Sequence, residues 1–234
     1  GYEPEYFGEA TQHVLCLGYD GIDINLGCPI ETINKRGQKR GAGLIGEYET
    51  VEKIVHLCRS AIDVPHRRDV ACYVSIDENK HYQRNKIRGW QPGTTGLSVK
   101  TRLGIDKAIT KEWITFLSSL PVDTIILHGR TKKQGYSGNA DWNEIAKAAK
   151  IAHQNGKMLL GNGDIISRED AVEKCQRYSC DGALIVRAAL GNPWSFEKMS
   201  FPRRRESTPS RRLPVMLRHA RYFDKVRGDT RFVA

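Results

Sequence analysis

Five short apolar runs recur along the chain, and longer stretches with apolar residues at helical spacing lie between them. The runs are rich in β-branched residues and almost continuously apolar, which is typical of strands buried on both faces of a parallel sheet. We predict strands at residues 22–26, 97–101, 124–128, 158–161 and 183–186.

The stretches between these runs predict helices. Gly18 is a suitable residue to end the first helix, and Ser167 with Asp170 has the spacing of a helix N-cap and its third helical residue. The predicted helices are 4–17, 48–60, 111–120, 142–154 and 167–175. Alternating strands and helices predict an α/β fold with right-handed crossovers.

Polar residues follow each of the five predicted strands. A doubly wound sheet would place a ligand site at a single switch point between its strands. In a (β/α)8 TIM barrel, by contrast, the carboxyl ends of all strands line one active-site face. Five successive polar strand ends therefore favour the barrel.

Two segments interrupt the alternation. Residues 63–96 lie between a helix and the next strand, where two to six residues are usual, and we interpret them as an inserted loop. Residues 198–214 are rich in arginine, serine and proline, which is typical of a linker, and a helical pattern resumes at 215–227. We predict a catalytic domain at 1–197, a basic linker at 198–214 and the start of a helical domain at 215–234.

The 234 residues carry a net charge of +10, and seven of these charges lie in residues 201–234. Such a basic end is either a solvated tail or an element that binds a polyanion such as RNA, and composition leaves both open. No run approaches the roughly 18 consecutive apolar residues of a membrane span, so we expect no membrane contact.

Six cysteines are present, and none forms a C-x-x-C pair or has histidines at zinc-ligand spacing. We therefore expect no metal site. The first residues show no secretory signal, so we expect a cytoplasmic protein with free thiols. Cys28 differs from the others, because it follows a predicted strand directly, in a Gly-Cys-Pro turn that should expose its thiol.

Five sequence blocks at the strand ends carry a family resemblance: DINLGCP at 23–29, VKTRLG at 99–104, HGRT with YSGNADW at 128–142, GNGDI at 161–165 and VRAALGNPW at 186–194. In this order they resemble the tRNA-dihydrouridine synthases, flavin enzymes that reduce uridine in tRNA. The resemblance covers residues 1–62, 97–197 and, more weakly, 215–234. It implies FMN as cofactor, NADPH as reductant and tRNA as partner.

The GNGD block follows a strand and precedes a helix, an arrangement in which glycines and a helix N-terminus suit a phosphate. Taken alone, the block is also compatible with a tight turn before a capped helix. In the family, this block and the turn after the last strand hold the FMN phosphate. The resemblance therefore implies a cofactor site that includes Asn162, Gly163, Asp164, Val186 and Arg187.

The resemblance also assigns roles at the other strand ends. Lys100 would stabilise the reduced flavin electrostatically, and His128 would lie beside the flavin and the substrate. Asn25 and Arg130 would bind the substrate uracil. Outside this context, Lys100 could be a surface lysine and His128 a structural histidine. Cys28 would be the catalytic acid that protonates C5 of the uracil.

The resemblance places the start of this chain after the family's third strand. Because eight strands are needed to close the barrel, we expect an incomplete barrel followed by the start of the family's helical tRNA-binding domain. Two alternatives remain. One is a truncated, non-catalytic fragment that retains RNA binding. The other is a different flavin barrel acting on pyrimidines, similar to a dihydroorotate dehydrogenase, which the HGRT and GNPW motifs argue against.

Overall fold

A computed structural model describes residues 2–17, 19, 21–30, 39–63 and 96–196. Five parallel strands form one sheet in the order of the chain, β1-β2-β3-β4-β5. The strands are β1 Gly21–Asn25, β2 Gly96–Arg102, β3 Thr124–His128, β4 Met158–Asn162 and β5 Gly182–Leu184. The predicted strands and the α/β parallel sheet are thus confirmed. β5 is shorter than predicted, because the chain turns at Val186 into a short 3-10 helix.

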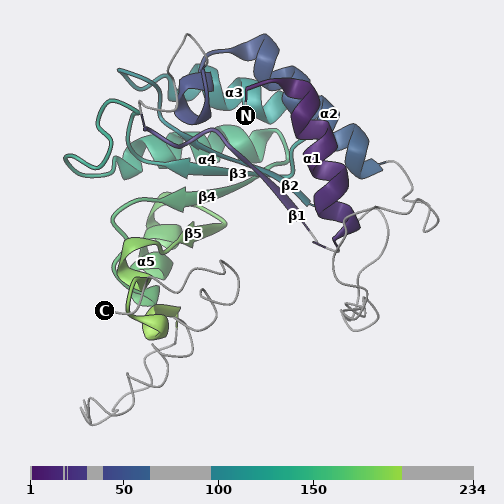
Figure 1. The fold of residues 1–234 in the computed structure, drawn as a ribbon. Coiled ribbons are helices and arrows are strands. Elements are labelled where there is room, and N and C mark those ends of the chain that lie inside the picture. Colours follow the sequence, from purple (N-terminus) through teal and green to yellow (C-terminus); the bar gives the residue numbers. More distant parts are fainter. Residues whose placement is uncertain (1, 18, 20, 31–38, 64–95, 197–234) are drawn as a thin grey trace, which may run out of the picture.

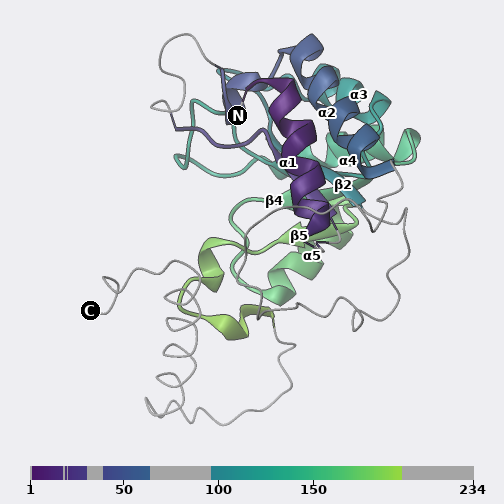
Figure 2. The same ribbon diagram turned by 45° about the vertical axis from the view of Figure 1, so that its right-hand side comes forward.

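Helices precede or follow each strand, as the alternation predicts. They are α1 Pro4–Cys16, α2 Tyr48–Asp63, α3 Thr110–Ser119, α4 Trp142–Gln154 and α5 Arg168–Tyr178, with short 3-10 turns η2 Gly41–Leu44, η4 Arg187–Ala189 and η5 Pro193–Phe196. α2, α3 and α4 lie on one side of the sheet, and α1 packs along α2 (Figures 1 and 2).

Side-chain caps set the starts of two helices. At α4, the Asp141 carboxylate accepts hydrogen bonds from two backbone N–H groups of the first turn. At α5, the Ser167 hydroxyl accepts one from the N–H of Asp170 at 3.1 Å, which confirms the predicted cap. These caps satisfy backbone donors that have no partner within a helix.

The two faces of the sheet differ in polarity. On the face covered by helices, Val99, Ile125 and Leu127 are fully buried, and Trp113 of α3 donates a hydrogen bond to the Thr101 hydroxyl at 3.0 Å. On the opposite face, β2 carries the polar side chains of Ser98, Lys100 and Arg102, whereas β3 carries apolar Ile126 before His128 at its end. A sheet with a helical coat on one side and polar strand ends on the other has the layout of a barrel wall.

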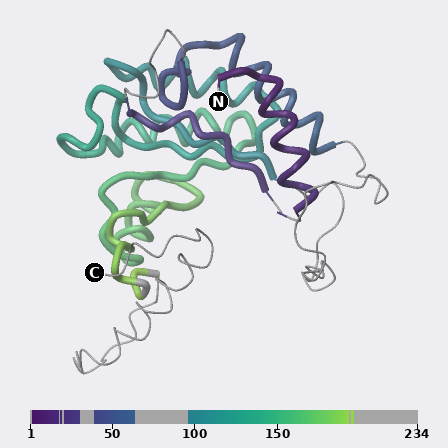
Figure 3. The backbone as a smooth tube through the Cα atoms, viewed as in Figure 1, coloured from purple at the N-terminus to yellow at the C-terminus, as the bar shows by residue number. Residues whose placement is uncertain are grey.

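The strand register brings the predicted polar ends to one edge. Asn25 pairs with Lys100 across β1 and β2, and Arg102, His128 and Asn162 are successive partners across β2, β3 and β4. The backbone trace follows the strands across the sheet in chain order from purple to green (Figure 3). Each strand therefore delivers its end to a common carboxyl edge of the sheet.

Several predictions concern residues that the structure does not describe, and one prediction about the cysteines is wrong. Nearly all of the inserted loop, the basic linker at 198–214 and the helical segment from 215 lie outside the described residues. Cys28, Cys58, Cys175 and Cys180 are free, but Cys16 is disulfide-bonded, so the expectation of free thiols is wrong for Cys16. Among the described residues, no helix has the length and apolar character of a membrane span, and no cluster of potential metal ligands occurs.

Candidate active site

The turn after β1 holds Cys28 in a fixed position. The Asn25 side-chain oxygen accepts hydrogen bonds from the N–H groups of Gly27 at 3.0 Å and Cys28 at 3.2 Å. The Cys28 carbonyl accepts one from the N–H of Ala42 at 3.0 Å. Gly41 has a φ of +53°, and a Cβ there would lie 2.9 Å from the Cys28 Cβ. The half-buried Cys28 thus carries a free thiol on a tightly packed turn.

Asn25 has a structural role that the sequence did not indicate. Its oxygen shapes the Cys28 turn, which leaves the amide NH2 as the group that can contact a ligand. The predicted contact of Asn25 with uracil therefore requires a carbonyl acceptor on the ligand.

Arg102 joins three segments at this edge, and the sequence did not single it out. The side chain is 2% exposed. Its Nε donates to the Gly27 carbonyl at 2.7 Å, and one terminal nitrogen donates to the carbonyls of Thr131 at 3.1 Å and Gly135 at 2.9 Å. The spacing of Lys100 and Arg102, two residues apart on one strand, was the available signal, because such residues share a face.

An exposed tyrosine ring lies between two guanidinium groups. The Tyr136 ring centroid is 5.8 Å from the Arg102 carbon Cζ and 5.6 Å from that of Arg187. Both distances fall within the range of cation–π attraction. Tyr136 therefore links the end of β2 to the turn after β5 across the edge of the sheet.

Lys100 lies in a cationic setting. Burial lowers its pKa, the neighbouring Arg102 lowers it further, and Asp23 raises it in part. The half-buried ammonium thus has more positive than negative charge close to it. A ligand with negative charge or electron-rich oxygens would relieve this imbalance.

His128 is 6% exposed at the end of β3. Burial, followed by the charges of Arg102, Lys100 and Arg130, lowers its pKa to about 3, against an opposing effect of Asp164. The imidazole is therefore neutral at physiological pH. A terminal nitrogen of Arg130 lies 3.3 Å from Nε2 of His128.

Arg130 is 2% exposed, and its guanidinium is occupied within the chain. It donates to both carboxylate oxygens of Asp164 at 2.8 and 2.6 Å and to the carbonyls of Ser137 at 3.3 Å and Gly138 at 2.5 Å. The structure therefore places Arg130 behind His128, held by the loop that follows β3. A contact of Arg130 with the substrate remains a sequence prediction.

Asp164 is the acid shared by Arg130 and Arg187. Its carboxylate also accepts from Arg187 at 2.7 Å and from the N–H of Ala140 at 2.7 Å. Burial raises the pKa of Asp164, but the hydrogen bonds from Arg130 and Ala140 and the charges of both arginines outweigh it, so the pKa is lowered. Asp164 is consequently ionised and fixed by three donors.

The glycines of the GNGD block permit close packing. A Cβ on Gly161 would lie 2.5 Å from the Trp142 ring, and one on Gly163, where φ is +126°, would lie 2.6 Å from the Ala140 Cβ. Asn162 is buried and donates to the Leu184 carbonyl at 3.1 Å. These contacts explain the glycines without a phosphate and leave the predicted phosphate contact untested.

The turn after β5 is open to solvent. Val186 is 51% exposed, and Arg187 is anchored only on one side, by Asp164 and the Tyr136 ring. Arg187 is therefore the most accessible guanidinium at the carboxyl edge and can reach an anion.

The structure brings the predicted site residues to one edge of the sheet. Hydrogen bonds and electrostatic interactions connect His128, Arg130, Asp164 and Arg187 with one another, and Arg102 connects them to the Cys28 turn. Arg130 and Arg187 share the Asp164 carboxylate, and Lys100 and Arg102 add positive charge beside a neutral imidazole and a free thiol. This set of donors fits a ligand with a phosphate and several ring carbonyls, such as a flavin mononucleotide.

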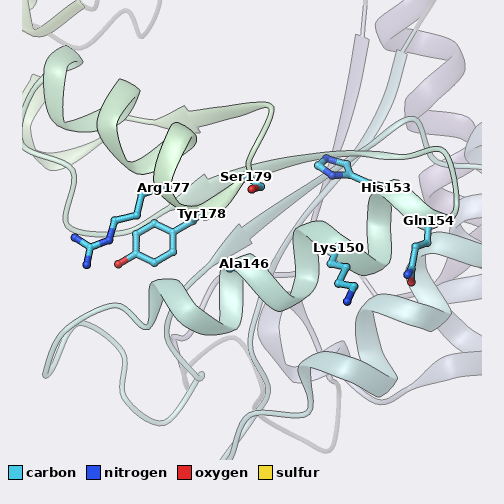
Figure 4. A pocket seen from close by; sticks show the side chains of 7 residues that line it. All are labelled: Ala146, Lys150, His153, Gln154, Arg177, Tyr178 and Ser179. Carbon is cyan, nitrogen blue, oxygen red and sulfur yellow. The ribbon is translucent and has the colours of Figure 1, made fainter.

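A hollow of about 580 Å³ lies elsewhere, on the outer helical layer. Its walls come from α4 and from the end of α5 (Figure 4). The lining residues are Ala146, Lys150, His153, Gln154, Arg177, Tyr178 and Ser179. None of the predicted site residues lines it.

Comparison with known proteins supports the family resemblance. A model of the dihydrouridine synthase family matches residues 1–88 and 94–231, and so also covers most of the segment interpreted as an insertion. A probable tRNA-dihydrouridine synthase of Staphylococcus aureus is 30% identical over an alignment of 235 residues, which covers 98% of this chain and 59% of that protein. One from Synechocystis is 31% identical over 193 residues, covering 82% of this chain and 44% of the relative. The chain thus spans about half of the length of these relatives.

Among solved structures, DHODH of Eimeria tenella in complex with ferulenol is similar in fold. The TM-score is 0.55 at 13% sequence identity, over 80% of this chain and 49% of that one. That protein is a TIM barrel, so the five-stranded sheet corresponds to part of such a barrel. The predicted fold of the (β/α)8 type is confirmed, and the described residues hold five of its strands.

Proposed function

Since this chain belongs to the dihydrouridine synthase family, we propose that it binds FMN at the carboxyl edge of its sheet and reduces the C5–C6 bond of uridine in tRNA, with NADPH as reductant. The observation that carries the proposal is the excess of cationic donors around a neutral His128 at this edge. A bound flavin would supply the hydride for C6 of the uracil.

The residues of the edge divide into two groups around such a cofactor. Lys100 and His128 lie on the sheet itself and would contact the ring. Arg187, with Val186 and the turn at residues 162–164, would contact the phosphate. The half-buried Lys100 ammonium would then stabilise negative charge on the reduced ring, in surroundings that strengthen electrostatic interactions.

Cys28 would supply the proton. Reduction of the C5–C6 bond adds a hydride at C6 and a proton at C5. The proton leaves the Cys28 Sγ, and the resulting thiolate regains one from solvent. The turn packed against Gly41 and Ala42 orients the thiol, and the free NH2 of Asn25 would hold a uracil carbonyl.

The tRNA must present the uridine outside its stack, because the edge is built on a rigid sheet. We assign the attraction of tRNA to the basic residues of 201–234, which lie outside the described part. In this proposal, residues 1–197 form the catalytic unit, 198–214 a linker and 215–234 the start of a tRNA-binding domain, in a cytoplasmic enzyme.

Binding of FMN to the full chain tests the cofactor site. Titration followed by flavin fluorescence should show saturable binding, weakened at least tenfold in Lys100→Met. Lys157→Met is the matched control, because Lys157 lies at the opposite edge, before β4, and should bind as the wild type does. Equal binding by wild type and Lys100→Met would contradict the proposed site.

NADPH-dependent reduction of unmodified tRNA tests the reaction. Cys28→Ala should retain FMN and lose about a hundredfold or more of the rate of dihydrouridine formation. Cys175→Ala, which alters a free, half-buried cysteine on α5, should keep the rate. A fully active Cys28→Ala variant would rule out the assigned acid.

A further inference from the structure

Behind His128 lies a buried ion pair that the proposed chemistry does not use directly. Arg130 contacts both carboxylate oxygens of Asp164, and its side chain is 2% exposed, while that of Asp164 is 31% exposed. Loss of Asp164 would be costly, because the guanidinium of Arg130 would be left without its anion in poorly solvated surroundings. The pair therefore fixes the position of the Arg130 guanidinium.

The same guanidinium determines which nitrogen of His128 carries the proton. A guanidinium has only N–H donors, so the Nε2 of His128, 3.3 Å from Arg130, must accept. A neutral imidazole has one N–H group, and that group is consequently at Nδ1.

Packing around the ring supports this orientation. A Cβ built on Gly163 would lie 3.0 Å from Cδ2 and 3.3 Å from Nε2 of His128. The Cδ2–Nε2 side of the ring is thus covered by protein. Within the described residues, no hydrogen bond engages Nδ1, so the opposite side of the ring is the one that can meet a ligand.

We propose that Arg130, fixed by Asp164, is a positioning residue that holds His128 as the neutral Nδ1–H tautomer, so that the imidazole donates a hydrogen bond to an acceptor atom of the bound cofactor. The last step rests on the proposed function. The tautomer itself is a property of the ligand-free protein.

The charged neighbours show why both partners are needed. Lys100, Arg102 and Arg130 face His128 as cations, and Asp164 is the anion that acts on it. Without Arg130, the Asp164 carboxylate would favour an imidazolium or an Nε2–H tautomer. Arg130 forms an ion pair with this carboxylate and directs one of its N–H groups to Nε2 of His128.

Nitrogen-detected NMR of the full, ligand-free chain with labelled histidine tests the assignment. The His128 signals are identified by their loss in His128→Gln. We expect an Nδ1–H tautomer that does not titrate between pH 5 and pH 8. An Nε2–H tautomer, or titration near pH 6.5, would overturn the inference.

Two variants separate positioning from mere stabilisation. In Arg130→Met, the Nδ1–H population should fall to a mixture of tautomers, and the His128 pKa should rise from about 3 towards its ordinary value. Arg59→Met is the matched control, because Arg59 forms a similar pair with Asp123 at the far edge of the sheet. Its His128 spectrum should equal that of the wild type. An unchanged tautomer in a folded Arg130→Met protein would refute the role.

The readouts keep the two proposals apart. Should Arg130→Met fail to fold, the wild-type tautomer still decides the inference. A chain that shows the Nδ1–H form but binds no FMN would contradict the proposed function and support the positioning role. A chain that binds FMN with His128 in the Nε2–H form would support the proposed function and contradict the positioning role of Arg130.

Discussion

The sheet has an amino edge, where its strands begin, and a carboxyl edge, where they end. Both edges use the same types of charged residue, but for different purposes. At the amino edge, Asp123 accepts from the N–H of Leu97 at 2.7 Å and from Arg59 at 2.8 Å. Asp181 repeats the arrangement with the N–H of Leu159 at 2.7 Å and with His153 at 2.8 Å. Each acid there secures the start of a strand and has its own basic partner.

At the carboxyl edge, positive charges outnumber negative ones. Arg130 and Arg187 share the single carboxylate of Asp164, and Lys100 and Arg102 add further positive charge. Paired charges at one edge stabilise the sheet. At the other edge, burial and the surplus of positive charge together lower the pKa of Lys100 and of His128, and the surplus creates a place for an anionic ligand. The contrast indicates that the function resides at the carboxyl edge.

Removing one arginine from each edge should give the largest difference. Arg130→Met leaves the carbonyls of Ser137 and Gly138 without their donor and removes one of the partners of Asp164, so it should reduce the free energy of unfolding by about 3 kcal/mol. Arg59→Met breaks a more exposed pair and should reduce it by about 1 kcal/mol. Urea unfolding measures both. Equal losses would show that the two pairs are energetically alike and would break the comparison.

The second largest difference should come from replacing one glycine at each edge by alanine. Gly163→Ala must fit a Cβ 2.6 Å from Ala140 at a φ of +126°, so we expect a loss of about 2–3 kcal/mol. Gly156→Ala, at the turn before β4, has a φ of +68° and nothing within 4 Å of the added carbon. Only conformational strain remains there, about 1 kcal/mol. Thermal unfolding distinguishes them, and similar shifts would contradict the close packing at Gly163.

Acid should weaken the paired edge. Burial raises the pKa of Asp123, but the Leu97 N–H and Arg59 outweigh it, so the folded-state pKa is lowered. A carboxyl of this kind stabilises the fold above its unfolded pKa of about 3.9, and the contribution is lost as pH falls through the lower folded value. Between pH 5 and pH 2, Asp123→Asn should therefore lose less stability than the wild type, by about 1 kcal/mol or less, because Asp123 is half exposed.

The exposed Asp106 supplies the control for this experiment, since its side chain is 74% exposed and pairs with an equally exposed lysine, Lys133. Asp106→Asn should follow the wild-type curve of stability against pH. A wild-type-like curve for Asp123→Asn would show that the amino edge does not depend on its ionised acid.

The smallest effect has the opposite sign. The lowered pKa of Lys100 means that its charged form is disfavoured in the folded chain, by burial and by Arg102. Lys100→Met should therefore raise the free energy of unfolding slightly, by about 0.5 kcal/mol, although it removes a proposed cofactor contact. Calorimetry measures the change, and a clear destabilisation would mean that Lys100 serves the fold.

Hydrophobic pattern and local caps were sufficient to predict the sheet. Strands at 22–26 and 124–128 and the Ser167 cap were visible because period and capping are local properties of the sequence. The common edge also followed, because parallel strands align their ends. The partners of buried charges were not predictable, since the contact of Arg130 with Asp164 spans 34 residues and depends on the register of two strands.

The same limit explains two other differences. The motif predicts a phosphate contact at Gly163, which stays a prediction, whereas the packing of Gly161 against Trp142 and of Gly163 against Ala140 is visible only in three dimensions. For Arg102, the sequence indicates by its spacing that it shares a face with Lys100, but not that its side chain is buried and engaged with three carbonyls.

The order of the strands determines where local unfolding of the carboxyl edge begins. β5 has three residues, all half-buried, and within the described chain it pairs only with β4, whereas β3 is enclosed by two neighbours and by helices. Regions with few buried contacts open at a lower free energy than the core. Fraying should therefore begin at β5 and carry Arg187 away while Arg130 and His128 stay in place, so the outermost donor exchanges with solvent long before the inner ones do.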